Sequence, residues 1–176
     1  MTIETLALEG LILFTPPRYT DERGYFEELF HQKRFGDVGL PTEFVQDNLS
    51  FSQAGVIRGL HFQREPHAQG KLVRVLKGFV TDVVVDIRPD SPTYGQHEKV
   101  DLSEENGALL YVPSGFAHGF EAHEDTYFLY KCTTLYSREA EGGILYNDPA
   151  LGIEWTINNP IVSPKDLILT PLVQLK

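Results

Sequence analysis

Residues Gly55 to Arg74 read GVIRGLHFQREPHAQGKLVR, and this stretch indicates both the fold and the site. Strand alternation predicts two shared faces, one with Ile57, Gly59, His61 and Gln63 and the other with Lys71, Val73 and Val75. A base, His61, and a cation, Lys71, are therefore expected to face one cavity. A lone histidine in a strand is more often a satisfied structural residue. Here several polar groups interrupt an apolar run, and such groups need partners or a function when they are buried.

The composition is that of an ordinary acidic globular protein. The chain has 176 residues, 41% of them hydrophobic and 23% charged, which predicts one domain spanning 1–176 with a substantial core. A formal net charge of −10 argues against binding to a nucleic-acid polymer or an anionic membrane, so local arginines are expected to recognise a small phosphorylated or acidic ligand. Cys132 is the single cysteine, and no apolar run approaches the roughly 20 residues of a membrane span. We expect a cytoplasmic protein.

Outward from the opening stretch, short apolar runs alternate with Gly, Pro, Asn and Ser. The clearest is 79–87 (FVTDVVVDI), bounded by Gly78 and Pro89. Further strands are expected at 11–15, 43–50, 71–77, 97–102, 109–112, 117–122 and 126–136, with a polar turn after 17, a short helix at 31–38 and a turn or helix start at 163–166. On a strand at 126–136, Tyr130 and Tyr136 would point the same way. The pattern predicts an all-β barrel or sandwich.

The six histidines raise the question of a metal site, because imidazole is the commonest metal ligand. A strand-borne site usually shows an H-x-H pair followed by a carboxylate, and no H-x-H occurs here. We therefore expect no metal. The G-x-S-x-G elbow, the phosphate-cradling G-x-x-x-x-G-K and the dinucleotide fingerprint are also absent from the sequence, which leaves His, Lys, Tyr and Arg chemistry.

Eight ordered blocks of sequence carry a resemblance to one family. They are DERGYFEELF (21–30), FVQDNLS (44–50), RGLHFQ (58–63), AQGKLVR (68–74), DIRPDSPTYGQ (86–96), PSGFAHGF (113–120), FLYKCT (128–133) and VSPKD (162–166). In this order they resemble the dTDP-4-dehydrorhamnose 3,5-epimerases. The resemblance implies a cupin-type double-stranded β-helix (jelly roll) with a few short helices, a homodimer, and no cofactor or metal. It also implies that dTDP-4-dehydro-6-deoxy-D-glucose is inverted at C3 and C5 through enolates, giving dTDP-4-dehydro-L-rhamnose for L-rhamnose synthesis.

The resemblance assigns proton transfer to four residues. His61 matches the general base, and Asp166 matches the carboxylate that orients and stabilises its imidazole. Lys71 would stabilise the developing enolate oxygen, and Tyr130 matches the acid that reprotonates from the opposite face. Taken without the motif, Tyr130 could equally be a buried aromatic residue whose hydroxyl finds a partner. Tyr136, the second choice for the acid, would also bind the substrate and control its ring conformation.

The same resemblance assigns substrate binding to further residues. Arg23, Phe26 and Glu28 match an arm that binds the thymidine part and that comes from the partner subunit in the family. The remaining positions are Gln46, Asn48, Arg58, His118, Glu141 and Lys165. Arg23 and Arg58 would bind the diphosphate. Strict alternation places Arg58 on the opposite face from His61, so we expect a bulge or strong twist at Gly59.

Two departures from the family pattern leave alternatives open. Tyr146 stands where the family often has Trp, and Leu49 replaces a commoner polar residue. An epimerase acting at C3 alone or C5 alone, or on a related dTDP-4-keto sugar, is one alternative. Others are a ketoisomerase, a metal-dependent cupin enzyme and a non-catalytic sugar-nucleotide-binding module. Product stereochemistry distinguishes the ketoisomerase, and a binding module would never exchange the C–H protons of its ligand.

Overall fold

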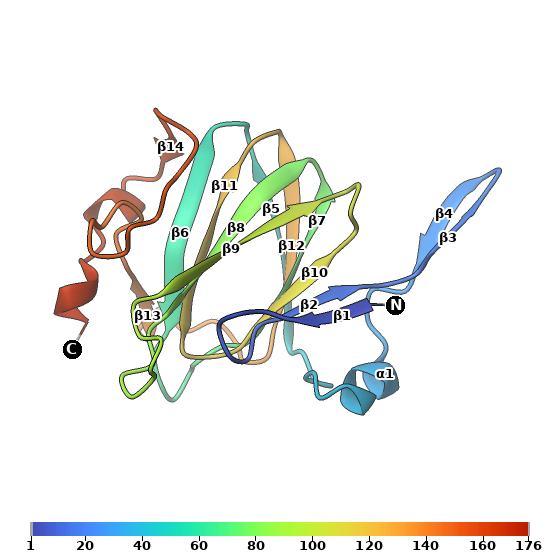
Figure 1. The fold of residues 1–176 in the computed structure, drawn as a ribbon, viewed down its shortest axis with the longest axis horizontal. Coiled ribbons are helices and arrows are strands. Elements are labelled where there is room, and N and C mark those ends of the chain that lie inside the picture. Colours follow the sequence, from blue (N-terminus) through green and yellow to red (C-terminus); the bar gives the residue numbers. More distant parts are fainter. Residues whose placement is uncertain (1, 176) are drawn as a thin grey trace.

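The alternating apolar runs form two six-stranded sheets that face each other (Figure 1). The computed structural model describes residues 2–175. In the first sheet all neighbours are antiparallel, in the order β1 (Thr2–Thr5), β2 (Ile12–Thr15), β10 (Leu109–Val112), β7 (Lys71–Lys77), β12 (Thr126–Cys132) and β5 (Gln46–Ser52). The second has the order β13 (Glu141–Gly143), β6 (Val56–Gln63), β11 (Phe116–Ala122), β8 (Phe79–Asp86) and β9 (His97–Ser103), with β14 (Ile161–Val162) parallel to β6. The predicted all-β jelly roll is confirmed.

The core between the sheets follows from the period-two alternation. Val73 and Val75 of β7 belong to the same buried cluster as Val84 of β8, and the rings of Phe120 and Phe128 stack with centroids 4.5 Å apart. The other face of the second sheet is covered by the C-terminal segment, through a cluster made of Leu60, Phe62, Val83, Val85, Ala117, Ile144, Leu151 and Leu172. Because both faces are covered, β8 and β11 are buried along almost their whole length.

Helices are few and short. Helix α1 (Gln32–Asp37) is capped by His31, whose side chain accepts a hydrogen bond from the backbone N–H of Arg34, and it packs Phe35 into a small aromatic cluster. Two 3₁₀ turns, η1 (Asp166–Ile168) and η2 (Leu172–Gln174), lie in the C-terminal segment. The prediction of a short helix at 31–38 is confirmed. Within residues 2–175, no helix has the length and apolar character needed to cross a membrane.

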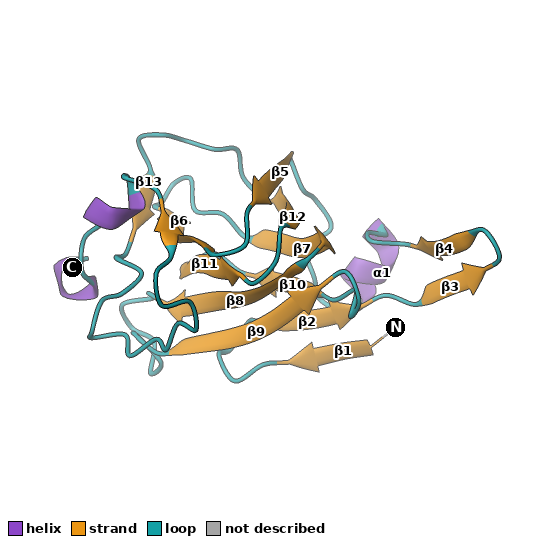
Figure 2. Ribbon diagram, turned by 90° about the horizontal axis from the view of Figure 1, so that it is seen from above, coloured by secondary structure: helices purple, strands orange, loops and turns teal. Residues whose placement is uncertain are grey.

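A hairpin of β3 (Arg18–Asp21) and β4 (Gly24–Glu27) projects from the body, on the side opposite to the C-terminal turns (Figure 2). Its base is held by Glu27, which forms ion pairs with Arg18, at 2.6 Å, and with the buried Arg74. Strand β3 was not expected, since 18–21 was interpreted as a polar turn. Both faces of the hairpin are exposed, so its sequence lacks the apolar alternation that reveals a half-buried strand.

The strand predicted at 126–136 is too long. Strand β12 ends at Cys132, because the chain then turns to bond the loop before β7: the N–H of Thr133 donates to the carbonyl of Gly70 (3.0 Å), and the hydroxyl of Thr134 donates to that of Ala68 (3.0 Å). Tyr136 therefore lies outside the strand. The prediction that its phenol points the same way as that of Tyr130 along one strand is wrong.

Candidate active site

Strand β6 carries a bulge between Arg58 and His61, at the position where the sequence predicted one. Against β11, His61 pairs with His118 and Arg58 pairs with Phe120, so three residues of β6 span the length that two residues span on β11. Arg58 and His61 consequently line the same cavity. The predicted irregularity at Gly59 is confirmed, and it corrects the first expectation for this strand. Ile57 alternates with Arg58, so it does not share a face with His61.

Two facing glycines make this bulge possible. Gly59 has a φ of +128°, and a Cβ built on it would lie 2.7 Å from the Cα of Gly119. A Cβ on Gly119 would lie 2.4 Å from the carbonyl oxygen of Arg58. The backbones of β6 and β11 thus touch at the point where both strands present histidines to the cavity.

The cavity between the sheets has a volume of about 210 Å³. Its lining comes from β5, β6, β7, β11 and β12 and consists of Ser50, Arg58, His61, Lys71, His118, Gly119, Phe120, Phe128 and Tyr130. Five of these residues were predicted from the sequence: Arg58, His61, Lys71, His118 and Tyr130. A second pocket shares Arg58 and His61 and is bordered by 161–166, which brings Lys165 and Asp166 to the same region.

The predicted base is held by the predicted carboxylate. His61 Nε2 lies 2.7 Å from Asp166 Oδ1, and Asp166 Oδ2 accepts a hydrogen bond from the N–H of Gly59 (3.3 Å). Asp166 is only 3% exposed. Burial acts to raise the pKa of Asp166, but the bonds from His61, Gly59 and Ser163 outweigh it and hold this pKa below its usual range. Asp166 is thus an anion that engages Nε2 and leaves Nδ1 of His61 for a ligand.

Lys71 and Tyr130 have shifted pKa values of opposite sense. Burial lowers the pKa of Lys71, and the charges of Asp82 and Glu141 oppose that decrease. Burial raises the pKa of Tyr130, so its phenol keeps its proton at neutral pH and can act as a proton donor. The two side chains belong to neighbouring strands and face one cavity. A cation and an acid are therefore available on the wall next to the base.

A chain of hydrogen bonds forms the rim between β5 and the C-terminal segment. Gln46 donates from Nε2 to Asn48 (2.9 Å) and accepts from the N–H of Tyr136 (2.8 Å). The phenol of Tyr136 donates to Glu141 Oε2 (3.0 Å), and Lys165 donates to the other oxygen of Glu141. Burial acts to raise the pKa of Glu141, but the bonds from Lys165 and Tyr136 lower it overall. Five predicted binding residues thus form one network, and Tyr136, 54% exposed, lies at the rim.

The three predicted residues of the arm do not reach the cavity of their own chain. Arg23 lies at the tip of the hairpin, paired with Asp21, and Phe26 is 66% exposed on β4. Glu28 lies just beyond β4 and pairs with Arg34 (2.9 Å). The hairpin points away from the strands that line the cavity (Figure 1).

Sequence reasoning missed five residues around the cavity: Ser50, Asp82, Gly119, Phe120 and Phe128. Four of them are lining residues that resemble ordinary strand positions, and no signal in the sequence distinguishes them. Asp82 had a signal, since it is a carboxylate on the inner face of the Val-rich run 79–87. Its Oδ2 lies 2.8 Å from His118 Nε2, so the cavity has two His–Asp pairs.

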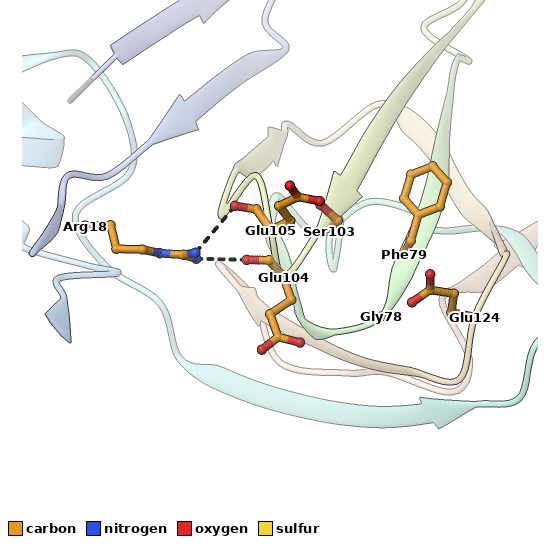
Figure 3. A pocket seen from close by; sticks show the side chains of 7 residues that line it. All are labelled: Arg18, Gly78, Phe79, Ser103, Glu104, Glu105 and Glu124. Atoms are coloured by element: carbon orange, nitrogen blue, oxygen red, sulfur yellow. Dashed lines mark hydrogen bonds between the residues drawn. The ribbon is translucent and has the colours of Figure 1, made fainter. Parts of the chain in front are cut away.

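The molecule also has a separate outer pocket of about 540 Å³, lined by Arg18, Gly78, Phe79, Ser103, Glu104, Glu105 and Glu124 (Figure 3). Arg18 donates there to the carbonyl oxygens of Glu104 (2.8 Å) and Glu105 (3.4 Å). None of the predicted site residues lines it. In the described part of the chain, no three His, Cys, Asp or Glu side chains come together in a way that could hold a metal ion.

One cavity of the jelly roll is lined by side chains that can remove a proton, stabilise the resulting negative charge and return a proton. This set of groups is typical of an isomerase that acts at carbon atoms. Comparison with known proteins shows to which family of isomerases the chain belongs. The sequence model of the dTDP-4-dehydrorhamnose 3,5-epimerases matches residues 5–174, and the chain belongs to this family of carbohydrate epimerases.

Three relatives illustrate the similarity. A dTDP-4-dehydrorhamnose 3,5-epimerase of Methanothermobacter thermautotrophicus is 50% identical over 170 residues, which cover 94% of this chain and 91% of the relative. A dTDP-4-dehydrorhamnose 3-epimerase of Streptomyces niveus is 39% identical, covering 94% and 81%. The crystal structure of a dTDP-6-deoxy-D-glucose-3,5-epimerase from Legionella pneumophila, in complex with dTDP-4-keto-L-rhamnose, aligns with a TM-score of 0.95 at 46% identity, covering 99% and 94%.

Proposed function

We propose that the chain, as a single domain spanning 1–176, epimerises dTDP-4-dehydro-6-deoxy-D-glucose at C3 and C5 in the cytoplasm and yields dTDP-4-dehydro-L-rhamnose. The observation that carries this proposal is the meeting of the His61–Asp166 pair, Lys71 and Tyr130 around one cavity. The ligand bound in the Legionella structure, dTDP-4-keto-L-rhamnose, is the same compound as the proposed product, dTDP-4-dehydro-L-rhamnose.

The reaction needs a base, a cation and an acid. The C–H bonds on both sides of the C4 ketone are acidic, so His61 Nδ1 takes the proton and the C–H electron pair moves into the carbonyl to form an enolate. Lys71, as an ammonium, stabilises the enolate oxygen. Tyr130 then donates its proton to the carbon from the opposite face, and solvent restores both side chains.

We propose that the dTDP part binds to the hydrogen-bonded rim and to the polar side chains at the cavity. Arg58 is held by hydrogen bonds to Ser52 Oγ (2.9 Å) and to the carbonyl of Phe51 (2.9 Å), and it and His118 face the cavity as donors for the diphosphate. Gln46, Asn48, Glu141, Lys165 and the phenol of Tyr136 would position the nucleoside. No metal or organic cofactor enters this proposal.

The experiment that tests the function is incubation of the protein with dTDP-4-dehydro-6-deoxy-D-glucose in deuterated water. We expect deuterium at both C3 and C5, together with inversion at both carbons, as read by NMR of the sugar. Deuterium at C3 alone would identify a 3-epimerase, the activity for which the Streptomyces niveus relative is named. A shift of the keto group without inversion would identify a ketoisomerase. An unlabelled ligand that still binds would contradict catalysis.

We further propose that the active unit is a homodimer in which the hairpin of one chain completes the site of the other. The hairpin presents Tyr19, Tyr25 and Phe26 exposed to solvent, although aromatic side chains of this size contribute most when they are buried. Its base is rigid, because Glu27 is tied to Arg18 and to Arg74. An arm that is rigid at its base, exposes aromatic side chains along its strands and carries Arg23 at its tip is suited to lie against a second molecule, where Arg23 and Phe26 would meet the dTDP part.

Mixed dimers test the exchanged arm. One chain carries Arg23→Ala, which removes the arm's cation, and the other carries His61→Asn, which removes the base. If arms are exchanged, a mixed dimer gathers both defects in one site and leaves the other site intact. Random pairing of equal amounts should therefore restore about one quarter of the unmutated activity, although each variant alone is nearly inactive. Recovery no greater than the sum of the two single variants would mean that each arm serves its own chain.

A further inference from the structure

Asp82 is a carboxylate inside the apolar interior of the barrel. Its neighbours on the inner face of β8 are Val80 and Val84, both fully buried members of the core, and Asp82 itself is 0% exposed. Oδ2 lies 2.8 Å from His118 Nε2, whereas Oδ1 has no hydrogen-bond partner among the described residues. A charge with half of its bonding capacity unused is costly in such a place, so it is expected to have a role there.

The surroundings of Asp82 indicate what that role is. The inner face of β7 places Lys71 on the same cavity as His118, and the negative charge of Asp82 acts to raise the pKa of Lys71. The other titratable groups that face this region are Arg58 and His61 on β6, His118 on β11, Tyr130 and Cys132 on β12, and Glu141 on β13. Among these, Glu141 is engaged by Lys165 and Tyr136 at the rim. Asp82 is the buried carboxylate bonded to the lining residue His118.

We propose that Asp82 is a positioning residue for the epimerisation: it orients the His118 ring through Nε2 and keeps Lys71 in the ammonium form that the enolate requires. With Nε2 engaged by the carboxylate, the His118 ring turns Nδ1 towards the ligand. The fixed negative charge also opposes the effect of burial on Lys71. This role rests on the proposed function, since it has a meaning only if Lys71 stabilises an enolate.

Asp82→Asn separates the charge from the hydrogen bond, because asparagine is isosteric and its amide oxygen can still accept from His118. Lys71 acts while protonated, so activity is lost as the pH rises through its pKa. Removing the nearby negative charge lowers that pKa further. The alkaline limb of kcat/KM should therefore move to lower pH by about one unit, with KM at neutral pH nearly unchanged. Lys71 sets this limb, because its pKa is lowered whereas that of Tyr130 is raised.

Asp82→Leu removes the acceptor as well, and should in addition raise KM as the His118 ring loses its orientation. Asp101→Asn, on the exposed side of β9, is the matched control and should keep the unmutated pH profile. An unshifted alkaline limb in Asp82→Asn would overturn the proposal, as would loss of the folded state in both Asp82→Asn and the smaller Asp82→Ser, which would assign Asp82 to stability. Absence of turnover in the unmutated protein would overturn the proposed function, and this inference with it.

Discussion

His61→Asn should abolish both the formation of inverted product and the uptake of deuterium from solvent. The imidazole is the group that removes the proton, and without it no enolate forms at C3 or at C5. Loss of a positioned general base typically lowers the rate by about 10²- to 10⁴-fold. Asparagine keeps a similar shape and can still bond Asp166, so the bulge of β6 and the cavity should persist. The measurement is NMR of the sugar in deuterated water, alongside product analysis at matched times.

His67→Asn is the control for this change, because His67 is exposed in the loop before β7 and its side chain takes no part in the cavity. It should turn over substrate at the unmutated rate. Binding of dTDP to the His61→Asn protein, followed by calorimetry, should be retained, since the dTDP contacts lie on other residues. If His61→Asn exchanged deuterium at the unmutated rate, another group would have to be the base, and the assignment of the His61–Asp166 pair would be wrong.

Tyr130→Phe should fail in a different way, with much of the exchange kept and most of the inversion lost. His61 can still remove a proton in this variant and return a solvent-derived proton to the same face, provided that the imidazole exchanges with water before reprotonation. The expected product is substrate that carries deuterium with its configuration retained. Loss of the donor should lower the rate of inversion by about 10²-fold or more, and the ratio of exchange to inversion is the quantity to measure.

Tyr127→Phe is the matched control, since Tyr127 lies on the same strand and faces solvent. It should leave both exchange and inversion unchanged. Inversion by Tyr130→Phe at the unmutated rate would remove Tyr130 from the role of acid. Tyr136 would then be tested, although its phenol already donates to Glu141 at the rim, outside the cavity lining.

The inner strands could be predicted closely because burial on at least one face gives them a clear period. Strand β7 has the predicted bounds, and β8 and β10 differ from theirs by one residue or less. The bulge of β6 could also be predicted, since two polar residues three positions apart, Arg58 and His61, were both needed on one face. Hairpin strand β3 could not be predicted, because both of its faces are exposed and no apolar alternation marks it.

Residue chemistry and the family motifs were sufficient to predict most of the polar side chains that line the cavity. They did not predict the buried carboxylate of Asp82 behind His118. His61, Lys71 and Tyr130 all line the cavity, as expected. Asp82 was visible as an acidic residue in a buried strand, but its partner, His118, is 36 residues away, and only the pairing of β8 with β11 shows that they meet. The predicted C-terminal end of the strand at 126–136 was wrong. The strand ends at Cys132 because the next residues bond to the loop before β7, which is distant in the sequence.

The contact between Gly59 and Gly119 has a consequence for anyone who would redesign this enzyme. Neither position has room for even one methyl group, so a library that varies residues around the cavity loses every substitution at these two sites. The histidines beside them, His61 and His118, are carried by backbones in direct contact, and a shift of one strand would displace both. A variant with a larger pocket for a bulkier sugar should therefore be sought on the opposite wall, at Ser50 and Phe128, where side chains rather than backbone define the space.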